Sequence, residues 1–160
     1  MNALAREFVA SFEGCYGYPP EDNEIIISDV EEAGSRSVLF DVDLPQEIID
    51  FYAVVEEVSF SDVGNGYFVH QLEQVISGIH GQQPTRVIGA VEDNVVVFGS
   101  SGGGELFALS SSGRGIYGLG GGAFLENYYD ADSAGLSMVA NDFLGFLEFL
   151  RHELWAAMGR

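Results

Sequence analysis

Seven acidic side chains stand where a carboxylate could bind a basic ligand. They are Glu47, Asp50, Glu56, Glu57, Glu92, Asp93 and Glu105. We expect the first four on the exposed side of a helix and the last three on a β-hairpin. Residues 21–57 carry twelve Asp or Glu and one base, Arg36. Exposed charges act over about 10 Å at 0.1 M salt, so the pattern indicates binding of a basic protein partner.

The whole chain is strongly acidic. Its 160 residues include 25 Asp and Glu against six bases, for a net charge of −19, and every one of the six bases is arginine. Such a chain repels nucleic acid and anionic lipid, so we expect neither as a partner. The alternative is that the charge serves solubility alone.

Two segments invite comparison with ligand-binding loops and depart from them. The glycine run 99–104 leads into a predicted strand, whereas a phosphate loop leads into a helix and commonly carries Lys, which this chain lacks. Residues 130–135 begin like a calcium loop, but position 141, where that loop needs Glu, is Asn141.

Asp41 and Asp43 flank Val42 on one side of a possible strand, and we interpret them as a solvated face.

The residues typical of metal and nucleophile sites are scattered. His70, His80 and His152 show no metal-binding spacing, and the chain has no nucleophile-elbow motif. Cys15 has no His nearby, and we interpret it as a part-buried thiol. We therefore expect no catalytic, metal or cofactor site, although Ser, His and Asp brought together by folding leave a hydrolase as an alternative.

The predicted elements centre on a hairpin. Val95–Phe98 is a short apolar run that favours a buried strand, the glycines at 99–104 reverse the chain, and 105–109 form the second strand. We expect positive φ or close packing at Gly103 or Gly104. Further strands are expected at 37–42, 59–63, 67–70, 86–91 and 116–119, and a loop at 124–135.

Helices are predicted on both sides of these strands. The apolar spacing and the caps indicate helices at 3–13, from Leu44-Pro45 through Val55, at 71–78, and from a cap at Asn141 or Asp142 to about Ala157. Residues 21–33 fit either a helix, which we favour, or a strand. The last helix should bury Phe143, Phe146, Leu147, Leu150 and Leu154. The sequence thus predicts a single α+β domain over 1–160, with a twisted, mainly antiparallel sheet packed against helices.

Three segments resemble one known family. They are Phe98-Gly99-Ser100-Ser101-Gly102-Gly103-Gly104-Glu105 between its strands, Leu44-Pro45 opening a helix, and Val139–Leu147 opening the last helix. Together they resemble the SUKH superfamily, which includes bacterial immunity proteins and yeast cell-wall-assembly regulators. The resemblance covers about two-thirds of the chain. The family often carries an Asn-Gly soon after the helix that Leu-Pro opens. In this chain Asn65-Gly66 lies later than that position.

The resemblance implies a function without catalysis. Immunity proteins of this family bind and occlude a toxin, often a nuclease, whose basic surface would suit an acidic partner. A regulatory interaction module of the same fold is the alternative. The first residues lack the basic start and apolar core of a secretory signal, and no apolar run approaches about 20 residues, so we expect a cytoplasmic protein that does not bind membranes.

Overall fold

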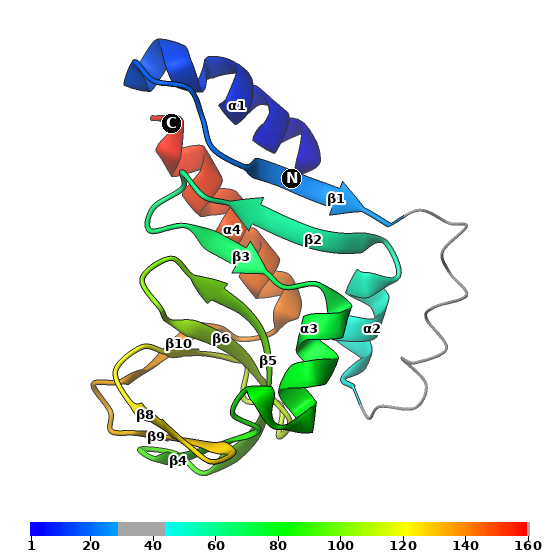
Figure 1. Cartoon of the computed structure of the whole chain (residues 1–160), viewed down its shortest axis with the longest axis vertical. Helices are drawn as coiled ribbons and strands as arrows, with labels where there is room; N and C mark the ends of the chain where they lie inside the picture. The colour runs from blue at the N-terminus through cyan, green and yellow to red at the C-terminus, as the bar shows by residue number, and fades with distance from the viewer. Residues whose placement is uncertain (29–43, 160) are drawn as a thin grey trace.

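A computed structural model describes residues 1–28 and 44–159 of the chain (Figure 1). The strand expected at 37–42, with Asp41 and Asp43, lies outside these residues. The helices are α1 (Asn2–Tyr16), α2 (Gln46–Tyr52), α3 (Leu72–Ser77), the π-helical turn η2 (Gly78–Gln82) and α4 (Phe143–Ala157). They combine with ten strands into the α+β fold that the sequence predicts.

Within the described residues, the strands pair antiparallel with one exception. They are β1 (Asn23–Ile27), β2 (Val55–Phe60), β3 (Tyr67–Val69), β4 (Arg86–Gly89), β5 (Asp93–Ser101), β6 (Leu106–Ser110), β7 (Ile116–Leu119), β8 (Ala123–Leu125), β9 (Tyr128–Ala131) and β10 (Leu136–Ala140). One path runs β1-β2-β3-β5-β4-β9-β8, and β6, β7 and β10 continue from the other side of β5. The β4–β9 pair is parallel.

The β5–β6 hairpin is the centre of the sheet, as predicted. One edge of β5 pairs with β4 through its first residues and with β3 through its last, while the other edge pairs with β6. Side chains alternate between faces along a strand, so Val96 and Phe98 enter one core and Val95 and Val97 enter another. This double burial explains the unbroken apolar run.

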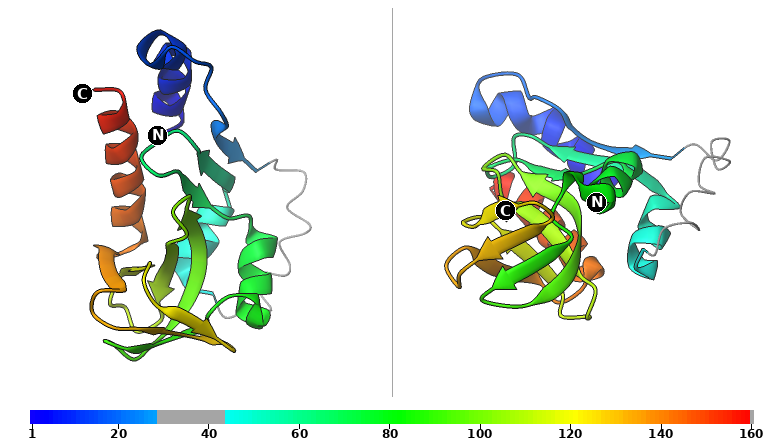
Figure 2. Two further views of the ribbon diagram at one scale, coloured as in Figure 1. Left: turned by 60° about the vertical axis from the view of Figure 1, so that its left-hand side comes forward. Right: turned by 60° about the horizontal axis from the view of Figure 1, so that its bottom comes forward.

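The two cores lie on opposite faces of the central strands. The larger core packs β2, β3, β5 and β6 against α1, α2 and α4, and Figure 2 shows α4 along this side of the sheet. The smaller core lies between β5–β7 and the β4–β9 pair; its largest fully buried side chain is Tyr117. Figure 1 shows β4, β8 and β9 together at the end of the molecule away from α1.

The last helix starts where its cap predicts. The Asp142 carboxylate accepts the backbone N–H of Gly145 at 2.6 Å. Its apolar stripe is narrower than the spacing suggests. Phe143, Phe146, Leu150 and Leu154 are buried, but Leu147 is only partly buried, Leu144 is 69% exposed and Trp155 is 43% exposed. A Cβ at Gly145 would meet Asp142 Oδ1 at 3.1 Å and the Cβ of Ala140 in β10 at 3.5 Å, so this glycine leaves room for the cap beside the end of the sheet.

Three predictions from local pattern were wrong. Residues 23–27 form edge strand β1, not the favoured helix, because they pair with β2. Residues 124–135 contain β8 and β9, not only a loop, because β9 pairs with distant β4. Val55 belongs to β2, so α2 is shorter than expected. The strands expected at 59–63 and 67–70 pair with each other, but the first is shifted: β2 ends at Phe60, and Gly66 has φ 82° in the turn before β3.

The glycine loop between β5 and β6 combines positive φ with close packing. Gly104 has φ 86°, as predicted. The close approach occurs at Gly102, where an added Cβ would lie 2.2 Å from the carbonyl oxygen of Asn65. The Gly102 N–H also donates to the Gly66 carbonyl at 3.1 Å. The loop is therefore held against the β2–β3 turn.

Candidate functional site

The seven predicted acidic residues occupy four separate places. Glu47 and Asp50 are exposed on α2, as expected. Glu56 and Glu57 lie on β2 rather than on a helix, and Glu56 is exposed while Glu57 is half-buried. Glu92 is exposed and forms an ion pair with Arg86 at 3.1 Å. The residues thus differ in how much of each carboxylate a partner could reach.

Asp93 is a buried hydrogen-bond acceptor, not an exposed contact residue. Its Oδ2 accepts the hydroxyls of Ser110 at 2.5 Å, Ser112 at 2.9 Å and Tyr117 at 2.9 Å. Burial by itself would raise the pKa of the Asp93 carboxyl, but these three bonds and nearby Arg114 outweigh it and lower the pKa. Asp93 therefore ties the start of β5 to β6 and β7.

Glu105 is engaged with the neighbouring strands. Its Oε1 accepts the Ser137 hydroxyl at 3.4 Å, and an added Cβ on Gly118 would lie 2.3 Å from this oxygen. The loop is closed instead by main chain, since the Ser101 N–H donates to the Glu105 carbonyl at 2.8 Å.

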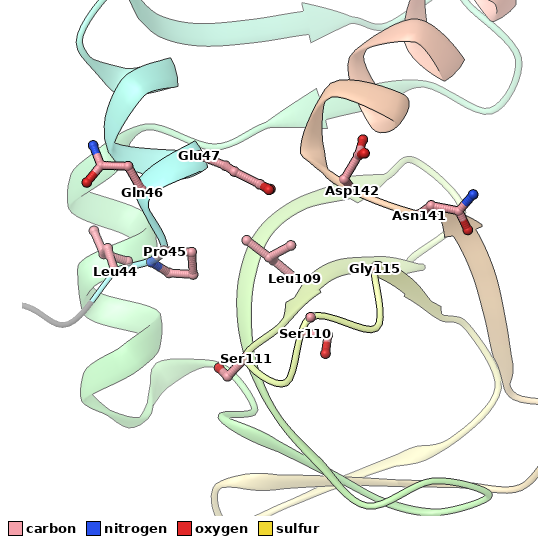
Figure 3. Close-up of a pocket in the computed structure, with 11 residues that line it drawn as sticks. Leu44, Pro45, Gln46, Glu47, Leu109, Ser110, Ser111, Gly115, Asn141 and Asp142 are labelled. Atoms are coloured by element: carbon pink, nitrogen blue, oxygen red, sulfur yellow. The ribbon is translucent and has the colours of Figure 1, made fainter.

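Glu47 borders a pocket of about 520 Å³ between α2, the β6–β7 turn and the start of α4 (Figure 3). Its carboxylate extends toward α4 and accepts the Phe143 N–H at 3.2 Å. Asp142 faces the same pocket and caps the helix through Gly145. Both acids thus satisfy free N–H groups of the α4 N-terminus, which makes the pocket primarily a junction between elements.

Glu57 borders a second pocket, of about 420 Å³, which combines groups that the sequence did not connect. Its lining consists of Glu57, Phe68, His70, Gln74, Gln82, Gln83 and Ser100. His70 Nε2 and Ser100 Oγ are joined by a 2.8 Å hydrogen bond. Glu57 Oε2 accepts the Gln71 side-chain amide at 2.7 Å. The pocket is thus polar, with one carboxylate and one imidazole.

The imidazole of His70 is held toward its neutral form. Burial lowers its pKa, and the charge of Glu57 opposes that shift without reversing it. The Tyr52 hydroxyl donates to the His70 carbonyl and fixes the backbone at this point. No sequence motif indicates this pair, because His70 and Ser100 meet only through the register of β3 with β5.

The other candidate residues do not converge. His80 and His152 are exposed, and so is Cys15, contrary to the part-buried position expected for it. Within residues 1–28 and 44–159, no three His, Cys, Asp or Glu side chains are grouped as metal ligands. No helix in the same residues combines the length and apolar character needed to span a membrane.

The chain was compared with protein-family models, with curated proteins and with solved structures, and none of the three comparisons found a match.

Proposed function

We propose that this protein binds a basic protein partner and acts by stoichiometric occlusion, without turnover. The observation that supports the proposal is the excess of carboxylates over cations in residues 44–85. This part of the chain contains six Asp or Glu and no Arg or Lys. The two ion pairs that join described residues, Arg86–Glu92 and Arg151–Glu148, both lie outside it.

An uncompensated acidic surface favours fast encounter with a basic protein and penalises acidic ones. A nuclease is a suitable partner because its substrate-binding surface is usually basic. With the SUKH resemblance, this favours an immunity protein that occludes a toxin in the cytoplasm. A regulatory module of the same fold is the alternative, and a toxin gene beside the gene for this chain would favour immunity.

The test is capture of the partner from the native host, identification by mass spectrometry, and measurement of binding by surface plasmon resonance. We expect a one-to-one complex with a basic protein and an association rate that falls as salt rises. If no stable protein partner is found, the proposal is wrong. If a partner binds at a rate independent of salt, the electrostatic part is wrong.

A hydrolase is a second candidate because His70 and Ser100 lie at the distance of a base and a nucleophile. In such a reaction Ser100 Oγ would attack an ester carbonyl carbon while His70 accepts the hydroxyl proton and returns it to the leaving alcohol. Water would then hydrolyse the acyl-serine. Turnover of p-nitrophenyl acetate that is lost in both Ser100→Ala and His70→Ala, and kept in Ser101→Ala, would favour this function over occlusion.

A further inference from the structure

The Glu57 pocket lies on the sheet face opposite the larger core. Val58 pairs with Val69, and both enter that core. Because side chains alternate, Glu57 and His70 lie next to each other on the other face. Phe68 pairs with Ser100 on the same face. A bulge between Val97 and Gly99 changes the alternation of β5 and thereby turns Ser100 toward His70.

The carboxylate of Glu57 has one oxygen available for a ligand. Gln71 occupies Oε2, and among the described residues no group donates a hydrogen bond to Oε1. The side-chain carbonyls of Gln74, Gln82 and Gln83 add further acceptors around the pocket. A neutral imidazole does not repel a cation, and Glu57 and Ser100, which lie beside the His70 ring, add no positive charge.

The pocket also carries an aromatic ring. Phe68 is half-buried and forms part of the lining. A guanidinium group is planar, carries five N–H donors that can reach several acceptors at once, and stacks on aromatic faces, whereas an ammonium is a compact, strongly hydrated charge. An acceptor-rich pocket with one carboxylate and one ring therefore suits arginine better than lysine.

We propose that this pocket receives an arginine side chain of the basic partner, with the guanidinium bound to Glu57 and its plane against Phe68. This inference rests on the proposed function, because it supplies the contact that would hold the basic protein in one orientation. Among the seven acidic residues, Glu57 combines partial burial, membership of a pocket and an oxygen not used within the described residues.

The first experiment uses N-acetyl-arginine amide as the probe and N-acetyl-citrulline amide as its neutral counterpart, followed by ¹H–¹⁵N NMR. We expect saturable shifts at Glu57, Phe68 and His70 with the arginine probe and none with citrulline. Glu57→Gln should weaken binding about tenfold, equivalent to about 1.4 kcal/mol. Glu73→Gln is the matched control: it removes the same charge from an exposed residue of α3 that lies outside the pocket lining and outside the seven predicted contact residues.

Three outcomes would overturn the inference: no saturable shift, equal binding of citrulline, or equal effects of the two Gln variants. The citrulline comparison uses the unmodified protein, so it decides the question even where a variant folds poorly. The second experiment measures partner binding by both variants. A partner that binds Glu57→Gln and wild type equally shows the pocket inference wrong and the proposed function intact. If the pocket binds the arginine probe but no protein partner is found, the pocket binds arginine and the proposed function is wrong.

Discussion

The Asp93 carboxylate accepts a hydrogen bond from the Tyr117 phenol at 2.9 Å, between the first residue of β5 and the middle of β7. Ser110 of β6 donates to the same oxygen. One charged atom thus joins three consecutive strands of the sheet next to the smaller core. Burial and the Asp93 charge raise the pKa of Tyr117, so its hydroxyl keeps its proton and remains a donor.

We expect Asp93→Asn to destabilise the fold by about 1.5–3 kcal/mol at pH 7, the range for hydrogen bonds to a charged group. The folded pKa of Asp93 lies below its ordinary value of 3.8. Its contribution is therefore complete above that value and is lost as pH falls through the folded pKa. Urea unfolding of wild type and variant should show a constant difference above about pH 5 that narrows below 3.8. A difference independent of pH would contradict the ionic role.

Phe146 tests the buried stripe of α4. It is completely buried against Phe98 and Phe107, so Phe146→Ala should cost about 3–5 kcal/mol. Leu144 on the same helix is 69% exposed, and Leu144→Ala should change stability by about 0.5 kcal/mol or less. Denaturant unfolding measures both. Similar losses for the two variants would mean that the helix face is assigned incorrectly.

Alanine substitutions in the glycine loop separate the effect of close packing on stability from the effect of backbone conformation. Gly102→Ala places a Cβ against the Asn65 backbone and should cost about 1–3 kcal/mol, as overpacking does. Gly104→Ala forces a left-handed φ on a residue with a side chain and should cost about 1–2 kcal/mol. Gly103→Ala meets nothing closer than 3.6 Å and should be nearly neutral. Thermal or urea unfolding of all three variants tests this order.

His70 should make the folded state less stable at acidic pH, whereas a histidine paired with a carboxylate makes it more stable there. Its folded pKa is lowered from 6.5 because burial disfavours the charged imidazole. The folded state therefore binds the proton less readily than the unfolded chain, and stability decreases as pH falls below 6.5 through the folded pKa. His70→Gln should remove this part of the pH dependence. An NMR titration of the ring that gives a pKa above 6.5 would contradict the expected sign.

Charge reversal tests the acidic surface of β2. Glu56→Lys should slow association with the captured partner more than it speeds dissociation, because Glu56 is exposed and exposed charges steer encounter. Surface plasmon resonance at several salt concentrations measures both rates. The difference from wild type should shrink as salt rises. An unchanged association rate would leave the net charge of −19 as a property of solubility.

The sequence determined the elements whose signals are local. A cap expected at Asn141 or Asp142, followed by apolar residues at helical spacing, identified α4, and an apolar run before a glycine cluster identified the β5–β6 hairpin. It also determined the acidic charge, which depends on composition alone. Positive φ in the glycine loop was predictable because glycine is the residue that tolerates it.

The tertiary structure decided everything that depends on which strands pair. Residues 23–27 become a strand only because β2 offers a partner edge, and residues 128–131 because β4 does. The same pairing buries Asp93 under three hydroxyls and brings Ser100 to His70 across thirty positions of sequence. The alternation of side chains along a strand shows which residues share one face of that strand. Which residue of the next strand lies beside them depends on the pairing register, and the register is set only when the sheet assembles.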